Sequence, residues 1–82
     1  MNIDPEAITL GQPVIHSNPQ IQGGVPVFVG TRVPVKNLFD YLETGDSLET
    51  FLDHFPTVGR QQAQAVLEAS REQLLNKYEI AA

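Results

Sequence analysis

The sequence predicts an α+β fold, mainly α, in which a small N-terminal β-hairpin or sheet precedes a trihelical, helix-turn-helix-like bundle. Two observations predict this fold. Val-rich segments between residues 25 and 35 are short and punctuated by proline and glycine, as strands and turns are. From residue 35 onward, apolar residues recur at the i, i+3, i+4, i+7 spacing of an amphipathic helix. A chain of 82 residues makes one domain of this kind.

The N-terminal half is expected to contain an arm and short strands. Residues 1–12, punctuated by proline and glycine, are expected to form the arm, and residues 13–78 a single compact domain. Strands are expected at residues 13–17, 25–29 and 32–35.

The last two strands are expected to form a hairpin. Gly30 followed by Thr31 is typical of a type II′ two-residue turn, which has glycine at its first central position. Pro26 and Pro34 have no backbone N–H, so they are expected where the arms begin and end and where no ladder donor is lost.

Three helices are expected at residues 36–44, 47–55 and 60–77. Each carries an apolar stripe that indicates its inner face. The stripes consist of Val35, Leu38, Phe39 and Leu42, then Leu48, Phe51, Leu52 and Phe55, then Ala63, Val66, Leu67, Ser70 and Leu74.

The helix ends are also marked in the sequence. Gly45 occupies the place of a left-handed residue that ends the first helix. Asp46 and Glu49 have the spacing of a capping box for the second helix. Gly59, with Gln62 three residues later, is expected to begin the third helix.

The composition indicates a cytoplasmic protein. The chain has no cysteine, no signal peptide and no apolar run long enough to span a bilayer. Its formal net charge of −5 opposes nonspecific attraction to nucleic acid, since that attraction comes from Lys and Arg. A protein partner therefore fits the overall charge better.

No catalytic or cofactor site is expected. His16 and His54 are far apart in sequence, and the acidic residues have no metal-ligand spacing. The glycines match neither of the known phosphate-loop spacings. We therefore expect a protein that is not an enzyme and that uses no metal or cofactor.

The third helix offers candidate DNA contacts at Arg60, Gln61, Gln64 and Arg71. Arginine and glutamine read guanine and adenine edges, and the start of a recognition helix contacts bases. The alternative is a three-helix bundle without a DNA role, and the pattern alone leaves both open.

Arg32, with the adjacent Thr31, is the candidate contact for a protein partner. A guanidinium after a hairpin tip can hold carboxylates in a bidentate pair. It can equally close an internal ion pair with Asp40, Glu43 or another acid, and the sequence does not choose between a partner contact and an internal pair.

A resemblance covers about residues 15–75. Gly24-Val25-Pro26, then Gly30-Thr31-Arg32-Val33-Pro34-Val35, then Gly45 and Phe55-Pro56, and an Ala/Leu-rich third helix at Ala65 to Leu67, all follow one pattern. In these motifs the chain resembles the domain-of-unknown-function family 433.

The resemblance implies a helix-turn-helix-like antitoxin of the VapB style that binds and silences a PIN-like ribonuclease toxin. It also implies regulation of the protein's own operon by binding operator DNA. A PIN-type active site is a carboxylate cluster that holds Mg²⁺ or Mn²⁺, so an inserted arginine such as Arg32 would pair with those acids and displace the metal. The alternatives are a stand-alone DNA-binding regulator and a dimeric protein-interaction module without DNA binding.

A homodimer is also expected. The hairpin leaves a strand edge exposed, and a small core gains from further burial. The apolar residues expected at this interface are Val27, Val29, Val33 and the face around Phe28.

Overall fold

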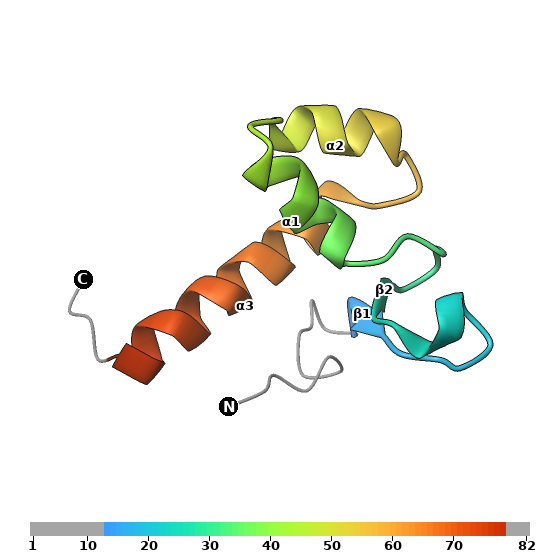
Figure 1. Ribbon diagram of the computed structural model, residues 1–82, viewed down its shortest axis with the longest axis horizontal. Helices are drawn as coiled ribbons and strands as arrows, with labels where there is room; N and C mark the ends of the chain where they lie inside the picture. Colours follow the sequence, from blue (N-terminus) through green and yellow to red (C-terminus); the bar gives the residue numbers. More distant parts are fainter. Residues whose placement is uncertain (1–12, 79–82) are drawn as a thin grey trace.

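The computed structural model describes residues 13–78, with side chains as far as residue 76. In chain order its elements are β1 (Ile15–His16), the 3₁₀ turn η2 (Gln22–Gly24), β2 (Val27–Phe28), α1 (Lys36–Glu43), α2 (Leu48–His54) and α3 (Arg60–Tyr78). A two-stranded sheet thus precedes three helices, and the predicted fold class is confirmed (Figure 1).

The sheet differs from the prediction in its pairing. β1 and β2 are antiparallel, with Ile15 opposite Phe28 and His16 opposite Val27. Residues 32–35, expected as a third strand, make only an isolated bridge between Val27 and Pro34. Because proline has no N–H, this segment cannot continue a hydrogen-bonded ladder, and the helix begins directly after it.

The predicted two-residue turn is also wrong. Hydrogen bonds flank the bridge, from the Val35 N–H to the Pro26 carbonyl at 2.9 Å and from the Phe28 N–H to the Val33 carbonyl at 3.1 Å. The Thr31 N–H closes a turn onto the Phe28 carbonyl at 3.0 Å, which puts Gly30 at the third turn position. Its φ of 82° is the value that a type II turn requires there.

The helix ends follow local chemistry. Gly45 has a φ of 92°, and the N–H groups of Gly45 and Asp46 return to the carbonyls of Leu42 and Tyr41, so α1 ends in the expected left-handed cap. The expected Asp46 capping box is wrong. Ser47 caps α2 instead, because its hydroxyl accepts the Thr50 N–H at 3.1 Å.

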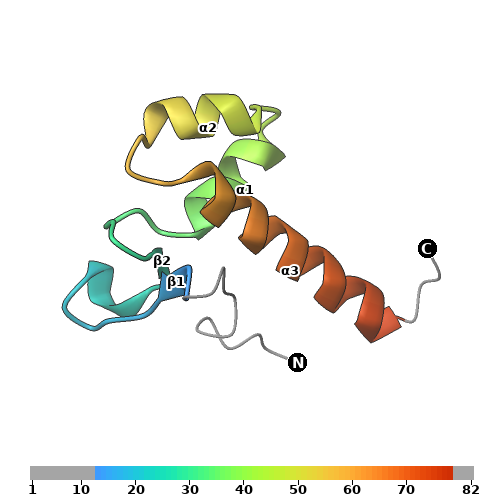
Figure 2. The same ribbon diagram turned by 180° about the vertical axis from the view of Figure 1, so that it is seen from behind.

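The core lies where the sheet, α1, α2 and the first half of α3 meet. Phe28, Leu38 and Phe51 are fully buried, and the Phe51 ring lies 6.2 Å from that of Phe28 and 5.5 Å from that of Tyr41. The second half of α3 extends away from the other described elements (Figure 2). Leu74, expected on the inner face, is therefore 54% exposed.

The face expected to bind a second copy is largely covered within the monomer. Val27 and Phe28 are fully buried, while Val29 is 37% exposed and Val33 is half-buried. The expected N-terminal arm, residues 1–12, lies outside the described residues.

Candidate functional site

The loop of residues 29–35, between β2 and α1, carries the candidate contact residues. Thr31 is buried, and its hydroxyl donates to the Phe28 carbonyl at 2.9 Å and accepts the Val33 N–H at 3.0 Å. Both hydrogen-bonding capacities of this hydroxyl are therefore used inside the loop. Thr31, expected as a partner contact, holds the loop in shape through these two bonds.

Arg32 is exposed beside this fixed residue. The internal ion pairs considered for it are not formed, because Asp40 pairs with Lys36 at 2.7 Å, and no acid within residues 13–76 pairs with Arg32. The other cations in this part of the chain, Lys36, Arg60 and Arg71, each have a carboxylate partner. Arg32 is thus the cation that the described part of the chain leaves available.

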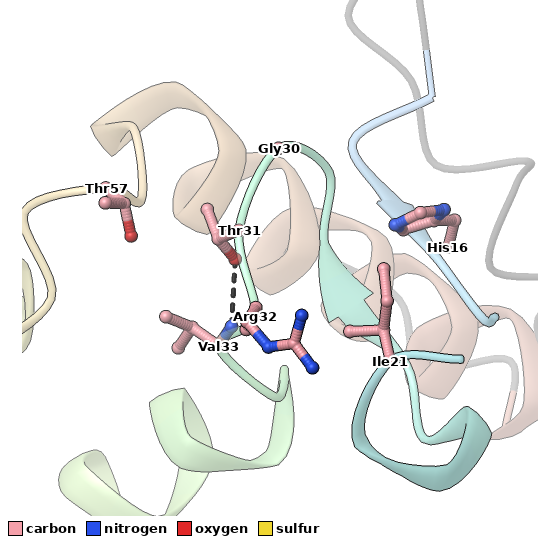
Figure 3. A pocket seen from close by; sticks show the side chains of 7 residues that line it. All are labelled: His16, Ile21, Gly30, Thr31, Arg32, Val33 and Thr57. Atoms are coloured by element: carbon pink, nitrogen blue, oxygen red, sulfur yellow. Dashed lines mark hydrogen bonds between the residues drawn. The ribbon is translucent and has the colours of Figure 1, made fainter. Parts of the chain in front are cut away.

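Arg32 also lines a pocket (Figure 3). His16 and Ile21 lie on one side, and Thr31, Val33 and Thr57 lie on the other, with the Arg32 guanidinium between the two sides. Residues distant in sequence meet here because β1 pairs with β2 and the turn before α3 packs beside the loop. The wall combines a cation, an imidazole and the aliphatic side chains of Ile21 and Val33.

Gln62 supports this loop from α3. Its side-chain oxygen accepts the Gly59 N–H at 2.9 Å, which confirms the capping role predicted for the pair. Its side-chain nitrogen donates to the carbonyls of Val29 at 3.1 Å and Val14 at 3.4 Å. The spacing of Gly59 and Gln62 predicted the cap, but no pattern in the sequence indicated the hydrogen bonds to Val29 and Val14.

The predicted DNA-contacting residues lie together on α3. Arg60, Gln64 and Arg71 follow helical spacing along one face, Gln61 adjoins it, and all four are exposed. Both arginines are paired, however, Arg60 with Glu49 of α2 and Arg71 with Glu68 at 3.5 Å. The charge on this face is therefore balanced.

The Arg60–Glu49 pair changes the protonation behaviour of both groups. The hydrogen bond from Arg60 lowers the pKa of the Glu49 carboxyl below its usual value, and the same bond raises the pKa of Arg60. The pair joins the start of α3 to α2 at the surface.

The histidines do not meet. His16 lines the pocket, whereas the exposed His54 shares a 2.7 Å hydrogen bond between its Nδ1 and the Tyr41 hydroxyl. Among the residues that the structure describes, no group of three or more His, Cys, Asp or Glu side chains is placed to hold a metal ion. Within the same part of the chain, no helix is both long and apolar enough to cross a membrane.

Comparison with known proteins gives a family and no function. One relative, the uncharacterized protein y4eO of Sinorhizobium fredii (strain NBRC 101917 / NGR234), is 37% identical over 49 residues, which are 60% of this chain and 22% of that protein. The chain thus spans about a fifth of the length of this relative. No solved structure matches. The family model described as "Protein of unknown function (DUF433)" matches residues 15–69, which include β1, the Arg32 loop and the first half of α3, and the chain therefore belongs to the DUF433 family.

Proposed function

We propose that this chain is a non-enzymatic, antitoxin-like regulator that binds and neutralises a PIN-like ribonuclease toxin. The observation that carries the proposal is Arg32, an exposed arginine without a carboxylate partner among residues 13–76, in a chain with a net charge of −5. Several acids lie within residues 13–76, yet none of them pairs with Arg32, and this arginine is available to an external partner.

The geometry around Arg32 supports a specific contact. Thr31 and Gln62 hold the loop through hydrogen bonds, so little backbone conformational entropy of the loop is lost when a partner binds. An arginine fork matches a carboxylate in a bidentate, charge-assisted pair. A PIN-type active site is a cluster of carboxylates around Mg²⁺ or Mn²⁺, and Arg32 inserted there would pair with those acids and displace the metal.

The charge on α3 supports this function over stand-alone DNA binding. Affinity for DNA comes largely from cations that neutralise phosphates. Arg60 and Arg71 are each engaged by a carboxylate, so binding of DNA by this face would require those pairs to open. Regulation of the operon is therefore assigned to the complex with the toxin. A homodimer within that complex would use Val25 and Val29, the exposed apolar residues near the sheet.

Co-expression with the product of the neighbouring gene tests the proposal. The two proteins are expected to co-purify and to lack ribonuclease activity. Arg32→Gln is expected to weaken the complex and restore cleavage of RNA, whereas Arg71→Gln, the matched change at an exposed arginine, is expected to do neither. The proposal fails if the neighbour is no nuclease and nothing co-purifies.

A mobility-shift assay distinguishes the proposed function from a stand-alone DNA-binding regulator. The isolated chain is expected not to shift its own promoter at physiological salt. A shift by the chain alone that is lost when Arg60, Gln61 and Gln64 are all changed to alanine would instead support a stand-alone DNA-binding regulator.

A further inference from the structure

The pocket beside Arg32 offers more to a ligand than the guanidinium. Gly30 and Arg32 both line it, and their backbone N–H groups donate to no acceptor among the described residues. The intervening Thr31 N–H and the following Val33 N–H are both used inside the loop. Unpaired amide donors next to an unpaired guanidinium form a set that is complemented by an anion.

The pocket also has two aliphatic side chains in its wall. Ile21, which precedes the 3₁₀ turn, and Val33, which follows Arg32, are both half-buried and face the pocket from opposite sides. Aliphatic walls favour a ligand that carries an apolar group beside its anion. A phosphate has no such group, and the acidic chain repels a polyanion.

We propose that this pocket recognises an acidic side chain of a partner protein together with the apolar side chain next to it in sequence. Arg32 and the amides of Gly30 and Arg32 hold the carboxylate, and Ile21 and Val33 contact the apolar group. The inference rests on the proposed function in that the ligand belongs to a protein partner, but it requires neither that the partner be a nuclease nor that metal be displaced.

Titration of the ¹⁵N-labelled full chain with capped dipeptides tests the site. Acetyl-Leu-Asp-amide is expected to shift the Gly30 and Arg32 amide resonances saturably. Acetyl-Leu-Asn-amide, which has the same shape without the charge, is expected to bind at least about tenfold more weakly, as expected for the loss of one charge-assisted hydrogen bond. Acetyl-Gly-Asp-amide is expected to bind more weakly than the leucine peptide.

Two variants test whether the shifts caused by the peptides depend on Arg32. Arg32→Gln is expected to abolish the shifts while the rest of the amide spectrum stays that of the folded protein, since this side chain is exposed. Arg71→Gln is expected to leave the shifts unchanged. The proposal is overturned if the asparagine peptide binds as well as the aspartate peptide, if Arg32→Gln still binds, or if no dipeptide shifts these resonances.

Inorganic phosphate and a peptide ending in a free carboxylate are the remaining probes. Binding of phosphate as tight as that of the aspartate peptide would assign the pocket to phosphate groups and overturn the proposal. If the pocket prefers acetyl-Asp-Leu with a free C-terminus over acetyl-Leu-Asp-amide, it binds the carboxylate of a chain end. That result would also overturn the proposal. No nuclease is present in these titrations, so their failure and the failure of the co-purification experiment are separate results.

Discussion

The side-chain amide of Gln62, in the first turn of α3, donates a hydrogen bond to the carbonyl oxygen of Val29 at 3.1 Å. This bond joins the start of the longest helix to the loop that carries Arg32. The same amide group also donates to Val14 and caps its own helix at Gly59. One side chain therefore connects the residue before β1, the loop and α3.

Gln62→Ala is expected to destabilise the fold by about 1–2 kcal/mol, because it removes a helix cap and two donors to backbone carbonyls. The free energy of unfolding in urea measures this change. Gln64→Ala, an exposed glutamine in the same helix, is expected to change it by less than about 0.5 kcal/mol. Equal effects of the two substitutions would contradict the role assigned to Gln62.

Thr31→Val is expected to cost about 1–2 kcal/mol, although the two side chains have nearly the same shape. Valine lacks the hydroxyl that accepts a hydrogen bond from the Val33 N–H and donates one to the Phe28 carbonyl, so both of these bonds are lost. Thr31→Ser keeps the hydroxyl and is expected to recover most of the loss. Chemical denaturation of the two variants checks this, and a serine variant no more stable than the valine variant would argue against it.

Gly45→Ala is expected to destabilise by about 1–2 kcal/mol through backbone conformation alone, since a left-handed residue with a side chain is strained. The φ of Gly45 is 92°, and an added Cβ would meet nothing within 4 Å. Gly45→Asn is expected to cost less, because asparagine tolerates this conformation better. Melting temperatures of the two variants give the order, and a reversed order would point to a steric cause.

Phe51→Ala is expected to cost about 3–5 kcal/mol, because Phe51 is fully buried against the rings of Phe28, Tyr41 and Phe55. In a domain this small, that loss approaches the whole stability. Leu74→Ala removes an apolar side chain that is 54% exposed and is expected to have little effect. Circular dichroism at increasing temperature compares them, and similar losses would place Leu74 in a contact that the described residues do not show.

The ion pair between Glu49 and Arg60 is expected to make a small contribution to stability that acid removes. The folded-state pKa of Glu49 is lowered, so the contribution is present at neutral pH and is lost as the pH falls through that lowered value. Both groups are at the surface, so the contribution is small and is screened by salt.

Melting curves of the wild type and Glu49→Gln, taken from about pH 7 to about pH 3, measure it. The two curves are expected to converge in acid. Glu72→Gln is the control, because Glu72 makes no ion pair within the described side chains. The melting temperatures of this variant and of the wild type are not expected to converge in acid in the same way. A constant difference for Glu49→Gln across this range would show that the pair does not stabilise the fold.

The helices could be predicted from the sequence because their determinants are local. Apolar spacing placed Leu38 and Phe51 on buried faces, and the capping roles of Gly45 and of Gly59 with Gln62 were visible in short motifs. The capping of α2 was assigned one residue early, since aspartate at 46 and serine at 47 are both good caps and only the backbone geometry selects Ser47.

The strand pairing and the site were decided by tertiary structure. Sequence determined that the segment around Gly30 is extended and turns, but β2 pairs with β1, and this partner depends on contacts between residues far apart in the chain. The same holds for Arg32. Its residue type and loop were visible in the sequence, whereas its lack of an acidic partner within residues 13–76 depends on where every carboxylate of the folded chain lies, because an ion pair is a matter of distance in space.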